Sequence, residues 1–475
     1  MIFTPREHQT LGIDHLGKTD EALLLAGMGL GKTAMVLERL SRDIADGSSR
    51  GALIIAPLRV SLFTWLDEVA KWENFRWMKV VSLRTPQGLA AWERGDACIY
   101  TLNYESIHIP RTHPATGEIK DSGLVAKLLK GKRASQLPVD TVIWDEISKA
   151  KNPASKRIQF FRKFRAKFKR HWGLTGTFTP NSVLDAFAQV RLIDDGKLFG
   201  KVMGNFKTQY FEPLDFHERK WGVRKECEGM IEAKLTSMAL TLRSEDWLDI
   251  PPTTLQDIPV ALPAKVRGIY KKLEKELIVR LADSKVKAVN KGVLVGKLQQ
   301  VVGGAVYAES LDEVFDSSTK IVTEVHAAKL KALRSLHDEQ GNKPMLVIVN
   351  FIHERERILR AFPEAEAFSS DKLARWNAGK IKMLVSHPLS MSHGLNMQSG
   401  GSQICWFTLP HSPEAYDQTN ARLARTGQEN ETQIFRLISP GTIDDAVAAT
   451  LANKDLTQQG FIARLNRNIK TLASL

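Results

Sequence analysis

The chain has 475 residues, of which 43% are hydrophobic and 25% are charged, and its formal net charge is +14 at pH 7. These proportions exclude a disordered or fibrous protein, and the length allows two or three domains with their own cores. The positive charge is typical of proteins with a polyanionic partner, although association with ribosomes or membrane surfaces would give the same balance.

Apolar strand-like runs alternate with amphipathic helical stretches over residues 1–194. The runs read EALLLAGMG, GALIIAPL, ACIYTLNY, TVIWDE and HWGLTGT. Residues 195–324 show longer helical patterns with few strand-like runs. The alternation resumes over residues 325–475 with PMLVIVNF, IKMLVSHP, SQICWFTLP and TQIFRLISP, and a basic helical extension closes the chain. The sequence predicts an α/β protein with two doubly wound parallel-sheet lobes and a mainly helical insertion between them.

A glycine-rich segment, AGMGLGKT at residues 26–33, follows the first strand-like run. Its glycines allow a tight turn whose backbone N–H groups point inward, and the helix expected to start at Lys32 adds its positive end. Lys32 would reach the β- and γ-phosphates of ATP, and the Thr33 hydroxyl would bind Mg²⁺. A chance GKT after a strand is the alternative. We expect the nucleotide to contact Met28, Gly29, Leu30, Gly31, Lys32 and Thr33.

Two adjacent acids, Asp145 and Glu146, end the strand-like run TVIW. Ligands bind beyond the carboxyl ends of strands in open parallel sheets. We therefore expect Asp145 to hold Mg²⁺ and Glu146 to accept the proton of the attacking water. Such a pair alone is more often a surface salt-bridge pair, but with the phosphate loop it makes ATP hydrolysis the leading interpretation. A kinase stays open, because a phosphate loop does not fix the acceptor.

Two arginines, Arg422 and Arg425, lie three residues apart in QTNARLARTGQ. On a helix they would share one face, where two guanidinium groups suit the charge on a transferring phosphoryl group. A solvated basic helix face is the alternative.

The ordered motifs resemble the SWI/SNF-like ATPases of helicase superfamily two. FTPREHQTLGIDHL, AGMGLGKT, WDEISKAKN, GLTGTFTPN, HGLNMQ and QTNARLARTGQ follow the family's order over nearly the whole chain. The pairing of HP at residues 387–388 with HGLN at 393–396 resembles the compact bacterial and phage subgroup. The resemblance implies two RecA-like lobes that use ATP and Mg²⁺ and move along double-stranded DNA.

The resemblance also assigns roles to single residues. Arg6, Gln9 and Gln418 would join the nucleotide site, and Thr175, Gly176 and Thr177 would couple hydrolysis to movement. Ile147 and Ser148 replace the small residue and the histidine of the family's acid box, so the route of coupling is not specified. Contacts with the DNA phosphates, without sequence preference, are expected at Arg59, Ser61, Tyr104, Arg162, Lys163, His387 and Asn396.

The basic stretch at residues 155–171 has two interpretations. Phe161, Phe164 and Phe168 recur at helical spacing. They favour a helix packed on the first sheet with a solvated basic side, and the alternative is direct contact of its cations with the duplex.

We therefore predict a DNA-stimulated ATPase that moves along duplex DNA and remodels DNA or DNA-bound proteins. Two alternatives stay open, a strand-separating DNA or RNA helicase and a nucleic-acid-binding scaffold with an ATP-binding switch. Three scattered cysteines, no secretion signal and no apolar run near the roughly 20 residues of a membrane span predict a cytoplasmic protein of a bacterium or a phage-infected cell, without a membrane partner. The sequence does not predict the oligomeric state, and a monomer is compatible with it.

Overall fold

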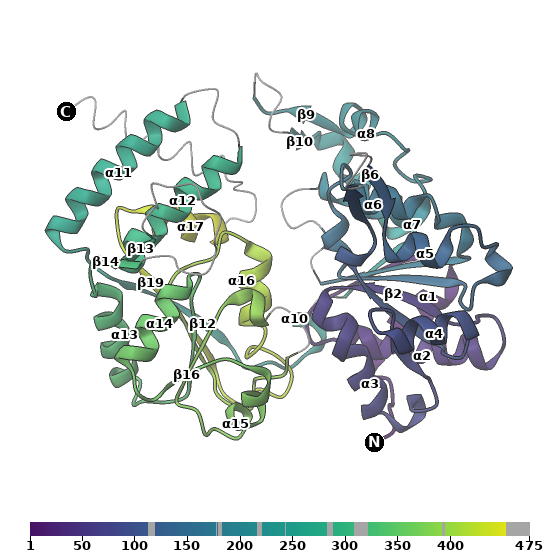
Figure 1. Ribbon diagram of the computed structural model, residues 1–475, viewed down its shortest axis with the longest axis horizontal. Coiled ribbons are helices and arrows are strands. Elements are labelled where there is room, and N and C mark those ends of the chain that lie inside the picture. Colours follow the sequence, from purple (N-terminus) through teal and green to yellow (C-terminus); the bar gives the residue numbers. More distant parts are fainter. Residues whose placement is uncertain are drawn as a thin grey trace. The chain divides into compact units, whose positions relative to one another are not determined.

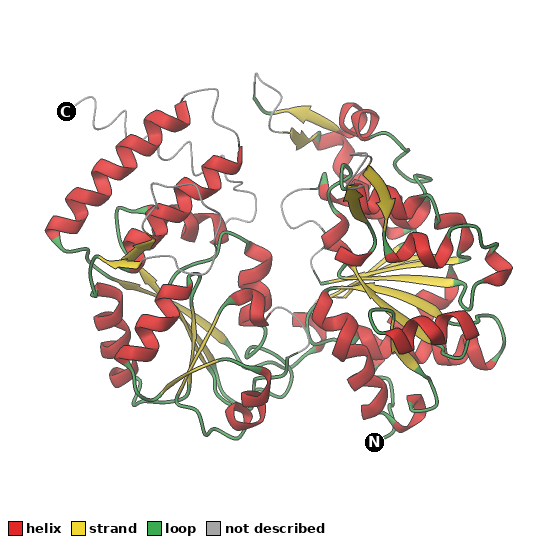
Figure 2. Cartoon of the chain, viewed as in Figure 1, coloured by secondary structure: helices red, strands yellow, loops and turns green. Residues whose placement is uncertain are grey.

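A computed structural model describes residues 1–112, 119–176, 178, 183–215, 221–242, 244–282, 288–307, 322–391 and 395–452. Contacts within the chain divide it into two compact units, Met1–Leu248 and Asp249–Leu475. Each unit contains a parallel sheet flanked by helices, as Figure 2 shows. The predicted fold class, with two RecA-like α/β lobes, is confirmed.

The first unit contains a seven-stranded sheet in the order β11-β1-β8-β7-β2-β4-β3, with every pairing parallel. In that order the strands are β11 (Ala239–Leu242), β1 (Glu21–Ala26), β8 (Arg170–Thr175), β7 (Thr141–Asp145), β2 (Ala52–Ala56), β4 (Ile99–Asn103) and β3 (Val80–Ser82). Two antiparallel hairpins lie outside this sheet, β5 (Ile109–Thr112) with β6 (Ile119–Ser122) and β9 (Phe211–Pro213) with β10 (Trp221–Val223).

Helices cover both faces of this sheet. Figure 1 shows α5 (Leu124–Leu129), α6 (Lys156–Arg162) and α7 (Asp185–Asp194) on one side, and α2 (Lys32–Ala45) and α3 (Trp65–Lys71) on the other. The remaining helices are α1 (Glu7–Lys18), α4 (Pro86–Arg94), α8 (Met203–Tyr210), α9 (Glu228–Thr236) and α10 (Ser244–Trp247).

The phenylalanines of the basic stretch pack in the core beside the first sheet, as predicted, but the expected helix ends at Arg162, and Phe164 and Phe168 lie beyond it. Phe161 is fully buried and meets Trp144 of β7 edge to face, with ring centroids 4.7 Å apart. Phe168 is buried as well, and the half-buried Phe164 packs against the same core.

The second unit contains a six-stranded parallel sheet in the order β12-β19-β18-β15-β17-β16. In that order the strands are β12 (Thr253–Pro259), β19 (Thr432–Ile438), β18 (Gln403–Trp406), β15 (Met345–Ile348), β17 (Met383–Ser386) and β16 (Ala365–Ala367). The helices are α11 (Ala264–Ala282), α12 (Ala288–Gly303), α13 (Ala328–Glu339), α14 (Ile352–Ala361), α15 (Leu373–Asn377), α16 (Pro413–Asn420) and α17 (Ile443–Ala452), and β13 (Ala305–Tyr307) pairs with β14 (Val322–Glu324).

The segment expected as a helical insertion, residues 195–324, contributes to both sheets. It contains helices α8 to α12, but β11 pairs with β1 in the first sheet and β12 pairs with β19 in the second. The boundaries of three separate domains stay a prediction. The C-terminal extension expected at 455–475 lies outside the described residues.

Candidate active site

The phosphate loop connects β1 to α2. Gly29 and Gly31 have φ of +85° and +82°, a left-handed conformation that glycine adopts without strain. Gly31 is the N-cap of α2, so the backbone N–H groups of the first helical turn point toward the loop. The ammonium of Lys32 donates to the carbonyls of Ala26 and Gly27 at 2.7 and 3.3 Å. The predicted strand, loop and helix are therefore present.

The N-terminal helix α1 lies against this loop. Gln9 donates from Nε2 to the carbonyl oxygen of Leu30 at 3.2 Å, and the buried His8 ring contacts the same oxygen at 3.2 Å. A Cβ on Gly31 would lie 2.5 Å from Gln9 Nε2. Gln9 thus contacts the phosphate loop, and its predicted contact with the nucleotide stays a prediction. Arg6 is exposed at the start of α1, and its backbone N–H donates to Gln9 Oε1 at 2.9 Å.

A serine that the sequence did not single out also contacts the loop. Ser244 begins α10, and its hydroxyl donates to the carbonyl of Met28 at 2.8 Å. A Cβ on Gly27 would come within 2.2 Å of that hydroxyl oxygen. The surrounding residues, TLRSEDWLDIPP, carry no sequence signal for this contact.

The acid pair lies at the carboxyl end of β7, separated from β1 by β8 alone. Thr175, the last residue of β8, donates to Glu146 Oε1 at 2.8 Å. Ser148, one of the two residues that depart from the family pattern, donates to the same oxygen at 3.2 Å. The sheet order therefore brings Lys32, Thr175 and Glu146 to one edge from three adjacent strands.

The carboxyl group of Asp145 is partly buried beside a second acid, and both conditions disfavour its ionised form. Burial, and next the neighbouring charge of Glu146, raise the pKa of Asp145 to about 6, whereas Lys32 and the indole of Trp65 act in the opposite direction. Trp65 donates from Nε1 to Asp145 Oδ2 at 3.0 Å. A carboxylate with a raised pKa beside a second acid suits a divalent cation, whose charge would favour its ionised form.

The segment of Thr175 and Gly176, at the end of β8, lies between the phosphate loop and the acid pair. A Cβ on Gly176 would lie 3.7 Å from the Lys32 ammonium and 3.5 Å from the carbonyl of Ala26. Thr175 and Gly176 are thus placed beside catalytic candidates from both neighbouring strands. Thr177 lies outside the described residues.

Two predicted DNA contacts are not supported, because their side chains are buried. The Ser61 hydroxyl donates to the carbonyl of Leu58 at 2.8 Å, and the side chain has no exposed surface. Tyr104 is 3% exposed, and its hydroxyl lies 3.0 and 3.2 Å from the carbonyl oxygens of Asp145 and Glu146. Neither hydroxyl can reach a phosphate in this conformation.

The other expected DNA contacts keep some exposure and stay predictions. In the first unit Arg59 is half-buried, Lys163 is exposed, and Arg162 forms a 3.7 Å ion pair with Asp195. In the second unit His387 is half-buried and accepts the backbone N–H of Leu389 at 3.1 Å, and Asn396 is exposed.

The two arginines of the second unit do not lie on a helix, which corrects the expected helical face. Helix α16 ends at Asn420, and the chain continues in turns. The Gln428 side-chain amide lies 3.0–3.3 Å from three backbone carbonyls and fixes this curled path. Arg422 and Arg425 nevertheless converge, because both donate to the carbonyl of Leu395, at 3.4 and 3.0 Å. Gln418 is buried in α16 and donates to Glu414 at 3.2 Å.

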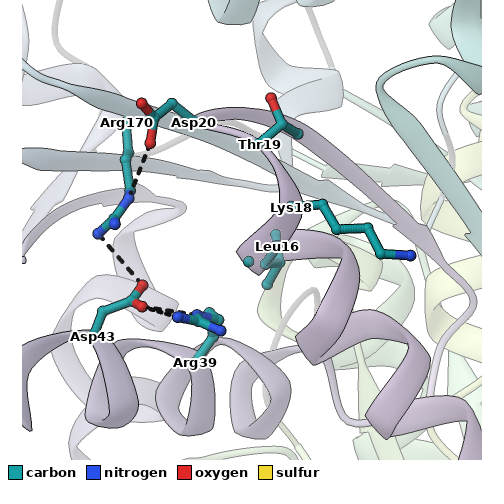
Figure 3. A pocket seen from close by; sticks show the side chains of 8 residues that line it. Leu16, Lys18, Thr19, Asp20, Arg39, Asp43 and Arg170 are labelled. Carbon is teal, nitrogen blue, oxygen red and sulfur yellow. Dashed lines mark hydrogen bonds and ion pairs between the residues drawn. The ribbon is translucent and has the colours of Figure 1, made fainter. Parts of the chain in front are cut away.

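A polar pocket of about 190 Å³ in the first unit lies at the opposite edge of the sheet, near the amino ends of β1 and β8 (Figure 3). Arg170 donates to Asp20 at 3.1 Å and forms a 3.4 Å ion pair with the buried Asp43, which Arg39 also contacts. These charges pair with one another. The pocket therefore joins α1, α2 and β8 and is distinct from the candidate nucleotide site.

Two other features are absent from the described part of the chain. No group of three or more His, Cys, Asp or Glu side chains is arranged to hold a metal ion there. No described helix is long and apolar enough to cross a membrane.

Comparisons with known proteins agree with these motifs. Residues 8–301 match the family profile described as the SNF2-related domain. Protein p41 of Acyrthosiphon pisum secondary endosymbiont phage 1 is 31% identical over 98% of this chain and 99% of its own length. The CHD3-type chromatin-remodeling factor CHR7 of Arabidopsis thaliana is 21% identical over 97% of this chain, which spans 38% of that relative. The Sulfolobus solfataricus SWI2/SNF2 ATPase core in complex with dsDNA aligns with a TM-score of 0.44 at 19% identity, covering 98% of this chain and 95% of that one.

Proposed function

Because this chain belongs to the SNF2-related family of ATPases, we propose that it hydrolyses ATP in response to double-stranded DNA and moves along the duplex. The observation that carries the proposal is the convergence of Lys32, Thr175 and Glu146 at one edge of the first sheet. A phosphate-binding loop beside a fixed carboxylate supports hydrolysis, because the carboxylate can accept a proton from water next to the bound phosphates.

Each residue has a distinct task in this proposal. Lys32 and the N–H groups at the start of α2 bind the phosphates. Gln9 supports the loop by its hydrogen bond to the carbonyl oxygen of Leu30. Thr33 and Asp145 would hold Mg²⁺, which when bound offsets the charge of the phosphate oxygens. Glu146, oriented by Thr175 and Ser148, accepts the proton of the attacking water.

Arg422 and Arg425 are proposed as the cations that act on the transferring phosphoryl group. Their shared contact with the Leu395 carbonyl keeps both guanidinium groups at one place in the second unit. Both arginines lie in the second unit, so activity is to be measured with the full chain.

Duplex DNA is the proposed partner, and DNA-bound proteins are the proposed targets of remodelling. The net charge of +14 supports binding to phosphates, which is independent of base sequence and lets a motor advance on any sequence. The proposed contacts are Arg59, Arg162, Lys163, His387 and Asn396.

ATP-dependent displacement of a third strand from a DNA triplex tests the movement, because a translocase removes the third strand without separating the duplex. We expect displacement with ATP and none with a non-hydrolysable analogue. Separation of a plain duplex instead would identify a helicase, and DNA binding without either activity would identify a scaffold with an ATP-binding switch.

A further inference from the structure

The hydroxyl of Tyr104 contacts the backbone on both sides of Glu146. Tyr104 follows β4, and its hydroxyl oxygen lies 3.0 Å from the carbonyl oxygen of Asp145 and 3.2 Å from that of Glu146. These carbonyls belong to the two peptide groups that flank the Glu146 Cα atom. A tyrosine hydroxyl is protonated at neutral pH, so it can donate to these carbonyl oxygens.

The backbone of Glu146 needs such support. Its φ of +58° and ψ of +56° lie in the left-handed region, which residues other than glycine, asparagine and aspartate rarely adopt. Conformations of this kind persist only where the surroundings hold them. Rotation about φ moves the Asp145 carbonyl relative to the Glu146 side chain, and rotation about ψ moves the Glu146 carbonyl. One hydroxyl in contact with both therefore restrains both angles.

We propose that Tyr104 is a positioning residue for hydrolysis, which holds Glu146 in its left-handed conformation and so aims its carboxylate at the attacking water. This role rests on the proposed function of Glu146. Tyr104 sets the backbone of the acid pair, whereas Thr175 and Ser148 orient the Glu146 carboxylate itself. The residue that the family resemblance suggested as a DNA contact thus acts on the acids from inside the unit.

Strand β4, which Tyr104 follows, supplies a matched control. Tyr100 lies in β4, is fully buried, and its hydroxyl donates to the carbonyl of Ala91 at 3.0 Å and accepts the N–H of Ala97 at 3.2 Å. Tyr100→Phe and Tyr104→Phe each remove one buried hydroxyl bonded to backbone and keep the ring. Only Tyr104→Phe removes a contact with the acid pair.

The test measures steady-state ATP hydrolysis at saturating duplex DNA, with melting temperature, for the full-length protein and both variants. We expect similar losses of melting temperature, a fall in kcat of about tenfold or more for Tyr104→Phe alone, and a KM for ATP within about twofold of the unaltered protein. A kcat of Tyr104→Phe equal to that of Tyr100→Phe would overturn the positioning role. Absence of hydrolysis by the unaltered protein would instead overturn the proposed function on which it rests.

Discussion

Thr175 donates a hydrogen bond of 2.8 Å to Glu146 Oε1. The contact crosses from β8 to the end of β7, and it joins the segment expected to couple hydrolysis to movement with the expected general base. The Glu146 carboxylate is therefore oriented in part by a residue of a neighbouring strand.

Removal of this hydroxyl should slow hydrolysis and leave nucleotide binding intact. For Thr175→Val we expect kcat to fall about ten- to a hundredfold, because a misplaced general base loses its alignment with water. The dissociation constant of a fluorescent ATP analogue should stay within about twofold. Thr175→Ser, which retains the hydroxyl, is the control, and equal rates for the two variants would disprove the orienting role.

The left-handed glycine of the phosphate loop should be essential for nucleotide binding. Gly31→Ala places a Cβ 2.5 Å from Gln9 Nε2 in a conformation with φ of +82°. We expect at least about tenfold weaker binding of ATP, in addition to a stability loss of about 1 kcal/mol for the left-handed backbone.

Gly47→Ala separates these two effects. Gly47 has a φ of +76°, and no atom lies within 4 Å of the position its Cβ would take. The control should lose similar stability in urea unfolding while binding ATP normally. Unchanged ATP binding by Gly31→Ala would contradict the requirement for glycine at this position of the loop.

Removal of the Arg425 guanidinium should affect turnover more than binding. For Arg425→Ala we expect kcat to fall by about a hundredfold or more, since a cation on the transferring phosphoryl group acts in the transition state. Arg360→Ala is the matched control in the second unit, because Arg360 is 69% exposed and pairs with Glu324 there. Similar kcat values for the two variants would exclude Arg425 from the chemistry.

The stability of the second unit should fall in mild acid. Burial, and next the charge of Arg357, lower the pKa of His353 to about 4. The unfolded chain binds a proton near pH 6.5, whereas the folded chain does not until about pH 4. The free energy of unfolding is therefore highest above pH 6.5, where the ring is neutral in both states. It decreases as the pH falls toward 4, because the unfolded chain gains a proton that the folded chain does not.

His353→Phe tests this linkage, because a phenyl ring can retain the packing of His353 on Phe351 and Tyr307 without titrating. Urea unfolding at pH 7, 6 and 5 should show a smaller decline for the variant. Between pH 7 and pH 5 the two proteins should differ in this decline by about 2 kcal/mol, because the folded pKa of about 4 lies below the range measured. Identical pH dependence would refute the assignment.

The sequence predicted the site where local pattern determines geometry. Strand, glycines and helix start are consecutive at residues 21–33, and parallel strands bring their carboxyl ends to one edge, so Lys32 and Glu146 could be placed together. Trp65 and Tyr104 could not, because no local motif marks a buried aromatic side chain as a partner of the acid pair. Those contacts depend on the order of the strands, which no single segment encodes.

Other differences between the structure and the sequence-based prediction also arise from tertiary contacts. Strand β12 has a mostly exposed pattern, so its residues lack the apolar run of a buried strand, yet it pairs along its length with β19. The turn that carries Arg422 and Arg425 depends on the contacts of Gln428 with carbonyls from two segments. Sequence spacing alone favours a continuous helix there.

The most direct test of the central claim is the steady-state rate of ATP hydrolysis by the full chain without nucleic acid and with duplex DNA, single-stranded DNA or RNA. Glu146→Gln serves as the control for contaminating activity. We predict strong stimulation by duplex DNA alone, abolished by Glu146→Gln. Stimulation by single strands or RNA in preference to duplex, or hydrolysis that survives Glu146→Gln, would contradict the account.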